Sequence, residues 1–170
     1  EKECKNVREN VGLLDMTAFA KCRIKGPKAE EFLNKLVANK LPKKIGRINL
    51  CHALNTKGGV HSEFTIMRES EDSFYLVSAG AFQRLDHDWI NKWMPRDGSV
   101  QFENLTNSIG VLVISGPKAR TLMQKISKTD FSNDKFKWLS AQNIDIGLAP
   151  CNAMRVNFVG ELGWELHHPI

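Results

Sequence analysis

The chain has 170 residues, of which 42% are hydrophobic and 25% charged. This composition excludes a disordered protein and leaves room for one domain with a core. The chain has no stretch of about 18 apolar residues, so we expect no membrane span. The formal net charge is +5, but the basic residues are scattered, with the densest group at Lys40, Lys43 and Lys44, so we expect a solvated surface and no nucleic-acid partner.

A short sequence occurs twice and predicts a duplication. Ile-Lys-Gly-Pro-Lys-Ala at Ile24–Ala29 recurs as Ile-Ser-Gly-Pro-Lys-Ala at Ile114–Ala119. In both copies a β-rich run precedes the glycine, and proline takes the first helical turn, where its missing N–H costs little. The apolar residues that follow lie on one helical face, at spacings 0, 3, 4 and 7: Ala29, Phe32, Leu33 and Leu36, then Ala119, Leu122, Met123 and Ile126. We therefore predict a duplicated strand–Gly-Pro–helix unit.

Between the two copies, two of the predicted strands and one helix can be assigned to residues. Val60–Met67 alternates, with Val60, Ser62, Phe64 and Ile66 on one face. Phe74–Val77 is a short strand. A helix follows Ala79-Gly80, with one apolar side that carries Phe82, Leu85, Trp89, Ile90 and Trp93.

After the helix, Val111–Ile114 is almost wholly apolar, which predicts a central strand. Ala153–Val159 alternates, and Gly160–Gly163 turns it into Trp164–Leu166 as a hairpin. The expected order is β-α-β-β-β-α-β-β-α-β-β. We predict a single α+β domain over residues 1–170, with a mixed or antiparallel sheet and helices on one face.

Glu63 is the first candidate for chemistry. It shares a predicted strand face with His61 and Thr65, just after the loop Asn55–Gly59. One interpretation is a solvent-facing strand carboxylate. The other is a carboxylate beside a Gly-Gly turn that lets a ligand approach the backbone closely.

Glu165 is the second candidate, directly after Trp164 and a glycine-rich turn. A carboxylate accepts two parallel hydrogen bonds from a planar pair of N–H donors. The 2-amino group and ring N3–H of a pterin form such a pair. An ordinary glutamate on an edge strand remains the alternative.

Other chemistries lack their motifs. The segment Lys57-Gly58-Gly59 has neither the spacing nor the following helix of a phosphate loop. The chain has no G-x-S-x-G elbow for a nucleophilic serine. It also has no G-x-G-x-x-G dinucleotide fingerprint, so we do not expect it to hold flavin. Cys51-His52 and His167-His168 do not form spaced ligand doublets, so we expect no metal. The cysteines are isolated, which predicts reduced thiols and an intracellular compartment: Cys4, Cys22, Cys51 and Cys151.

Five motifs, in order, resemble the folate-binding module of the aminomethyltransferase family: Val11–Thr17, Gly26-Pro27, Leu54–Val60, Gly116-Pro117 and Phe158–Leu166. The last motif is more similar to dimethylglycine and sarcosine dehydrogenases than to the glycine-cleavage T-protein; it reads Phe-Val-Gly-Glu-Leu-Gly-Trp-Glu-Leu. The resemblance implies the N-terminal part of the aminomethyltransferase folate-binding fold. The rest of the folate module, a C-terminal barrel and an N-terminal flavin domain would lie outside this chain.

The resemblance also implies an activity. The parent protein would use FAD, in its missing N-terminal half, to oxidise an N-methyl amine to an iminium. The folate half would then capture the one-carbon unit on tetrahydrofolate as 5,10-methylenetetrahydrofolate. We expect the isolated chain to be inactive, to have the other domains of the parent as partners, and to be cytoplasmic, or in the mitochondrial matrix of a eukaryote.

The resemblance further assigns roles to single residues. Glu63 would orient N10 of folate and take its proton, as a catalytic general base. Glu165 would hold the pterin ring, with Trp164 beside it in the folate site. Phe158 stands where relatives often have Tyr, so it could stack without a hydroxyl. Ser78 stands where relatives have Asn or Thr and would contact the pterin.

Two other functions stay open. One is a non-catalytic binding or regulatory module with the same fold, which the presence of both Glu63 and Glu165 disfavours. The other is a glycine-cleavage aminomethyltransferase. Trp164 disfavours it, as does His61-Ser62-Glu63, where two adjacent aspartates would be expected.

Overall fold

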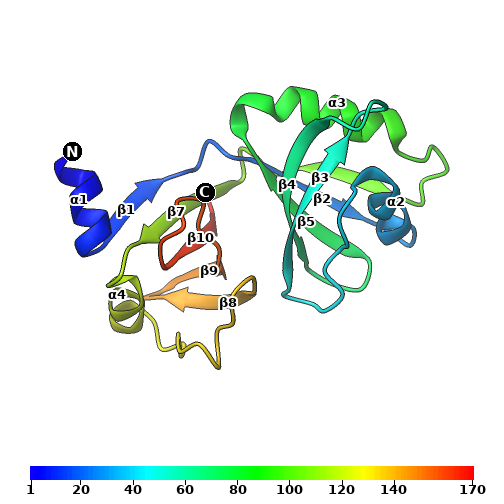
Figure 1. Ribbon diagram of the computed structural model, residues 1–170. Helices are drawn as coiled ribbons and strands as arrows, with labels where there is room; N and C mark the ends of the chain where they lie inside the picture. Colours follow the sequence, from blue (N-terminus) through cyan, green and yellow to red (C-terminus); the bar gives the residue numbers. More distant parts are fainter. The chain divides into compact units, whose positions relative to one another are not determined.

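The computed structural model describes all residues, 1–170, and their contacts divide the chain into two compact units. The terminal unit comprises Glu1–Thr17 and Ser108–Ile170, and the central unit comprises Ala18–Asn107. Each unit contains one five-stranded sheet (Figure 1), and every strand pair in both sheets is antiparallel. The predicted α+β class is confirmed. That residues 1–170 form one partial folate-type domain stays a prediction.

The central unit has the strand order β3-β4-β5-β2-β6. Its elements are β2 (Ala20–Lys25), α2 (Ala29–Leu36), β3 (Ile48–Leu54), β4 (Val60–Arg68), β5 (Ser73–Ser78), the 3₁₀ turn η1 (Gly80–Phe82), α3 (Gln83–Trp93) and β6 (Gln101–Asn104).

The terminal unit has the strand order β1-β7-β10-β9-β8. Its elements are α1 (Lys2–Glu9), β1 (Gly12–Asp15), β7 (Ile109–Ser115), α4 (Ala119–Ile126), β8 (Ala141–Ile146), β9 (Ala149–Met154) and β10 (Gly163–Pro169). The sequence pattern did not predict α1, and none of its residues is buried.

The duplication is confirmed and covers more than the repeated motif. When β2 is matched with β7, the central sheet read as β6-β2-β5-β4-β3 corresponds strand by strand to β1-β7-β10-β9-β8. In both units the strand before Gly-Pro lies inside the sheet, and an eight-residue helix follows it. The two units therefore have the same strand order with different sequences. They differ in one connection, because the edge strand β6 follows the other strands of its sheet in the chain, whereas β1 precedes them.

The two Gly-Pro junctions share a backbone geometry that excludes side chains. The φ angles are +126° at Gly26 and +130° at Gly116, a region that L-residues rarely adopt. A Cβ atom would lie 2.4 Å from the Ser99 carbonyl oxygen at the first junction and 2.6 Å from the Asn10 carbonyl oxygen at the second. Both glycines are therefore required by close backbone contact as well as by φ.

We expect Gly116→Ala to lower the free energy of unfolding by about 2–3 kcal/mol, because strain at φ and a clash with backbone act together. Gly147→Ala is the matched control: its φ is +60°, and a Cβ there meets nothing within 4 Å. The control should lose only about 1 kcal/mol. Urea unfolding of both variants measures the difference, and equal losses would contradict the close-contact argument.

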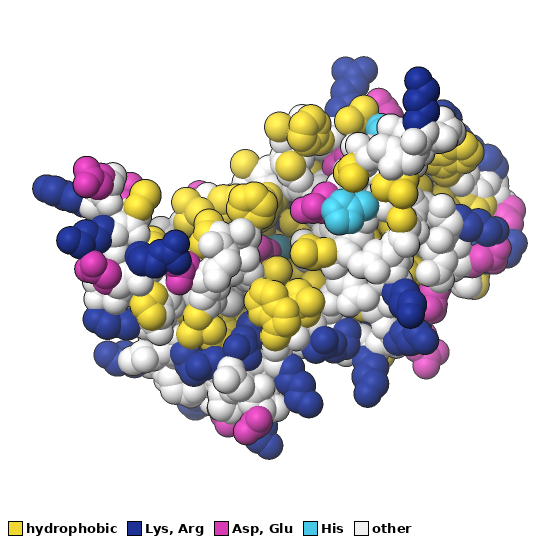
Figure 2. Space-filling view, viewed as in Figure 1, with side chains coloured by type: hydrophobic (Ala, Val, Ile, Leu, Met, Phe, Trp, Pro, Cys, Tyr) yellow, Lys and Arg dark blue, Asp and Glu magenta, His cyan; other side chains and the backbone are white.

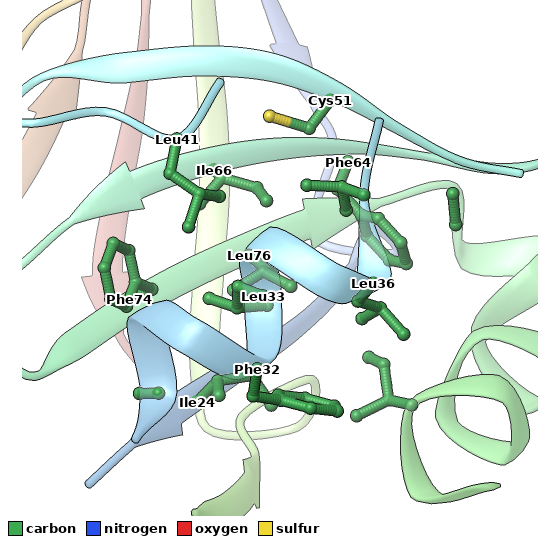
Figure 3. Packing of buried hydrophobic residues seen from close by; sticks show 14 of the residues in the cluster. Ile24, Phe32, Leu33, Leu36, Leu41, Cys51, Phe64, Ile66, Phe74 and Leu76 are labelled. Carbon is green, nitrogen blue, oxygen red and sulfur yellow. The ribbon is translucent and has the colours of Figure 1, made fainter. Parts of the chain in front are cut away.

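The predicted apolar face of α2 packs on the central sheet. Phe32, Leu33 and Leu36 are at most 7% exposed. In Figure 3 they lie among side chains from the strands, and this core contains Ile24, Phe64, Ile66, Phe74 and Leu76. The matching face of α4 packs in the terminal unit, where Ala119 and Met123 are fully buried. Helical periodicity thus identified both packing faces correctly.

The prediction for α3 was partly wrong. Phe82, which precedes the helix, and Leu85 and Trp93 within it are about half exposed, at 57%, 46% and 51%. The residues that the helix buries are Asp86 and Ile90, one turn apart. The buried face of α3 therefore contains a carboxylate that is satisfied by hydrogen bonds, while part of its apolar side faces solvent.

The C-terminal hairpin also differs from the prediction. β9 and β10 pair as predicted, but β9 ends at Met154, and residues 155–162 form a loop. The Asn157 side chain donates a hydrogen bond to Ser115 Oγ (2.8 Å) and accepts one from the Val159 backbone N–H (3.0 Å). These side-chain bonds replace the strand ladder, so the alternation in Ala153–Val159 did not continue the strand.

The basic side chains are scattered, as the sequence suggested; Figure 2 shows Lys and Arg distributed over the face in view rather than gathered in one patch. No helix has the length and apolar character needed to cross a membrane.

Candidate functional site

Glu63 lies in the middle of β4 and points away from the core of the central unit. Its neighbours Phe64 and Ile66 belong to the core that α2 covers. Its cross-strand partner on β3 is His52, and Glu63 Oε2 lies 2.8 Å from His52 Nε2. The Glu63 side chain is 57% exposed. The alternation therefore placed Glu63 correctly on the solvent-facing side of the hairpin.

His61 does not share that face. The pairing between β3 and β4 shifts after Ala53, which leaves His61 as the extra residue of a β-bulge. Its ring stacks on Trp89 of α3, with centroids 4.0 Å apart. Since α3 packs on the core side of the sheet, the expectation that His61 and Glu63 share a face was wrong. A bulge changes side-chain direction, and simple alternation does not reveal it.

Ser78, the last residue of β5, makes a hydrogen bond inside the unit. Its Oγ donates to Asp86 Oδ2 (2.6 Å), and Ser62 Oγ donates to the other oxygen of the same carboxylate. Asp86 is 2% exposed. This carboxylate ties α3 to β4 and β5, and the sequence analysis missed it. The Ser78 oxygen keeps its acceptor capacity, and its predicted pterin contact stays a prediction.

The three buried cysteines are not reactive thiols. Burial, with the nearby Asp86 carboxylate as a smaller cause, raises the pKa of Cys22 to about 12. Burial also raises the pKa of Cys51 and of Cys151 to about 11. All the cysteines are free thiols. These three thiols are therefore protonated at neutral pH, when they are poor nucleophiles.

Glu165 is buried in the interior of the terminal sheet. β10 lies between β7 and β9, where Glu165 pairs with Val113 and Met154. The alternative of an edge-strand glutamate is therefore wrong. Glu165 is 6% exposed, and its Oε2 lies 3.1 Å from Nε2 of His167, which is 4% exposed. The sequence analysis missed this partner, although two residues along a strand return to the same face.

Trp164 is a core residue of the terminal unit. Its indole is fully buried. The rings of Phe131 and Phe136 meet it edge-on, with centroids 5.3 and 6.0 Å away. The guanidinium carbons of Arg120 and Arg155 lie 5.9 and 5.7 Å from its centroid. The predicted contact between Trp164 and folate stays a prediction.

The duplication explains why this position is aromatic. Trp164 on β10 and Phe74 on β5 each pair with the isoleucine two residues before the Gly-Pro glycine. Arg68, at the end of β4, lies 5.0 Å from the Phe74 centroid, and Arg155 takes the same place just after β9. Both units therefore stack an arginine on a buried aromatic ring at matching positions.

Phe158 lies in the loop of residues 155–162 and is 87% exposed. An exposed ring is available for stacking, and its predicted contact with the pterin stays a prediction. Of the predicted site residues, Glu63 and Ser78 belong to the central unit, whereas Phe158, Trp164 and Glu165 belong to the terminal unit. No group of three or more His, Cys, Asp or Glu side chains is arranged to hold a metal ion.

Comparison with known proteins identifies the family. The model of the GCVT N-terminal domain matches residues 1–170. Rat mitochondrial dimethylglycine dehydrogenase is 38% identical over 167 residues, which are 98% of this chain and 19% of that protein. An aminomethyltransferase from Thermoanaerobacter sp. is 32% identical, over 96% of this chain and 44% of the relative.

A solved structure has the same fold. The crystal structure of the glycine cleavage system aminomethyltransferase T from Bartonella henselae superposes with a TM-score of 0.83 at 22% identity, and the match covers 99% of this chain and 44% of that one. The chain thus spans only part of these proteins. On its sequence, its duplicated sheets and these matches, the chain belongs to the GCVT N-terminal domain family.

Proposed function

We propose that this chain is the tetrahydrofolate-binding, one-carbon transfer part of a flavin-dependent N-methyl amine dehydrogenase that acts on dimethylglycine or sarcosine. In this proposal it forms 5,10-methylenetetrahydrofolate. The identity to dimethylglycine dehydrogenase, 38% over 98% of the chain, supports the proposal. FAD and the amine site would lie in domains outside this chain, and those domains would be its partners.

The position of the Glu63 carboxylate is the observation that carries the proposal. The carboxylate points out of the antiparallel hairpin of β3 and β4, and one of its oxygens is held by His52 at 2.8 Å. The other oxygen can accept a proton from a ligand. Closing a methylene bridge between N5 and N10 of tetrahydrofolate requires removal of the N10 proton, and Glu63 is the residue we assign to that step.

The position of Glu165 supports the proposal that the chain binds the pterin ring of tetrahydrofolate. One oxygen of this buried carboxylate contacts His167, and the other can accept a hydrogen bond from a ligand. β10 is paired on both sides, which fixes the backbone at Glu165 and the face of the sheet on which the side chain lies. A fixed, buried acceptor suits the planar N–H donors of a pterin. We also assign Phe158, Ser78 and Trp164 to folate binding, Trp164 by supporting the strand.

We expect Glu165→Gln to raise the dissociation constant for a reduced folate by about 10–100-fold in the full-length protein. The amide would direct an NH₂ group toward pterin donors and lose a charge-assisted bond of about 1.5–3 kcal/mol. Calorimetric titration measures this change. Glu161→Gln, in the neighbouring loop, is the control and should bind normally. An unchanged dissociation constant in Glu165→Gln would leave this residue as a structural partner of His167.

An amine-oxidation assay on the full-length protein tests the alternative functions. With an artificial electron acceptor, an amine dehydrogenase consumes dimethylglycine or sarcosine without folate. A glycine-cleavage aminomethyltransferase does not, and a non-catalytic module shows neither activity. The rodent and human relatives are named as mitochondrial, so we propose a mitochondrial matrix location if the source is eukaryotic.

A further inference from the structure

The central unit contains a cavity that the proposed folate residues do not line. Its volume is about 460 Å³. It lies between α2, α3 and the turn after β3, on the helix side of the sheet, whereas Glu63 points from the opposite side. Its walls come from one unit alone: Lys28, Glu31, Phe32, Lys35, Leu36, Leu54, Asn55, Thr56, Trp89, Trp93 and Pro95.

Two tryptophans form an aromatic corner in this cavity. Trp89 and Trp93 are one turn apart on α3, with centroids 5.8 Å apart and ring planes at 70°. His61, stacked on Trp89, holds that ring in place. Trp93 is 51% exposed. Half-exposed indole surface beside a cavity favours binding of a flat apolar ring.

The charged side chains around the cavity favour an anion. Lys28 and Lys35 belong to its lining, against one carboxylate, Glu31. Lys92 Nζ lies 5.6 and 5.0 Å from the two indole centroids and adds positive charge at the corner. The lysines are paired with surface carboxylates, Lys28 with Asp97 at 3.1 Å and Lys35 with Glu31 at 2.7 Å. Such exposed pairs are weak, so a ligand carboxylate can replace one of them.

We propose that this cavity is a second ligand site, for a small aromatic carboxylate. The ring would pack in the tryptophan corner, with the carboxylate near Lys28 and Lys35. A cavity of about 460 Å³ is within the usual range for small-molecule sites and accommodates a bicyclic aromatic acid. This site is independent of the proposed folate function, because none of the residues assigned to folate lines it.

The test uses 2-naphthoate as the probe and the indole N–H signals of the four tryptophans as reporters. In a ¹H–¹⁵N spectrum of the whole chain, naphthoate should shift the signals of Trp89 and Trp93 and leave those of Trp138 and Trp164 in place. The neutral analogue 2-naphthalenemethanol should bind about 2–5-fold more weakly, because it lacks the charge.

Variants locate the site. Trp93→Ala should weaken naphthoate binding by about tenfold, because it removes a face of the ring corner. Trp138→Ala is the matched control: this indole is 54% exposed, close to the 51% of Trp93, but lies in the other unit, and its loss should change nothing. Lys35→Gln should weaken binding by about 2–5-fold and reduce its salt dependence.

Three outcomes would overturn the proposal: no binding below about 10 mM naphthoate, equal shifts at all the indoles, or equal affinity in Trp93→Ala and Trp138→Ala. If Trp93→Ala impairs folding, Trp93→Phe replaces it. That variant should fold normally and keep most of the affinity, because it keeps an aromatic ring, and loss of all binding in it would also count against a stacking site.

Discussion

Replacement of Glu63 by Gln should lower the rate of 5,10-methylenetetrahydrofolate formation by about 10²–10⁴-fold in the full-length enzyme, while consumption of the amine continues. Glutamine keeps the size of the side chain and can still contact His52, but it cannot take the N10 proton. The oxidised one-carbon unit should then leave as free formaldehyde. The ratio of formaldehyde to methylenetetrahydrofolate measures the effect directly.

A matched control separates catalysis from a general effect on the sheet. Glu103 is also a strand glutamate of the central unit; it is half-buried and is held by Arg23 at 3.0 Å. Glu103→Gln should leave the product ratio at the wild-type value. If Glu63→Gln partitions its products as the wild type does, Glu63 has no catalytic role, and the non-catalytic binding module becomes the better proposal.

Trp164→Ala should lower the free energy of unfolding by about 3–5 kcal/mol, the range for loss of a large aromatic side chain from a core. The indole is fully buried against Phe131 and Phe136, so its removal leaves a cavity that these rings cannot fill without moving. Chemical denaturation followed by circular dichroism measures the loss. Trp138→Ala, at a half-exposed indole, should lose less than about 1 kcal/mol.

The same variants separate two roles of Trp164. Phe74→Ala, at the matching position of the central unit, should cost about as much stability as Trp164→Ala. If Trp164→Ala instead keeps its stability but loses affinity for reduced folate, the packing role is wrong and a direct contact with the ligand is supported. Trp164→Phe should restore most of the stability, because it keeps a buried ring.

Local sequence determined the repeated parts of this protein. The Gly-Pro motifs predicted the two helices, but each helix begins two residues after the proline, which lies before the N-cap and not in the first turn as predicted. The spacing of Phe32, Leu33 and Leu36 predicted the face that packs. Alternation along β4 predicted that Glu63 points away from the core. These features depend on residues close together in the chain, where backbone geometry sets side-chain direction. The family resemblance came from the same motifs in order.

Contacts between distant segments decided the rest. The register of β3 against β4 creates the bulge that turns His61 onto Trp89. The pairing of β10 with both β7 and β9 makes Glu165 an interior residue. Asp86 can be buried because the hydroxyls of Ser62 and Ser78, on two different strands, donate hydrogen bonds to its carboxylate. Each of these outcomes depends on pairing across the sheet or on the packing of α3 against it, and such long-range contacts leave no periodic signal in the sequence.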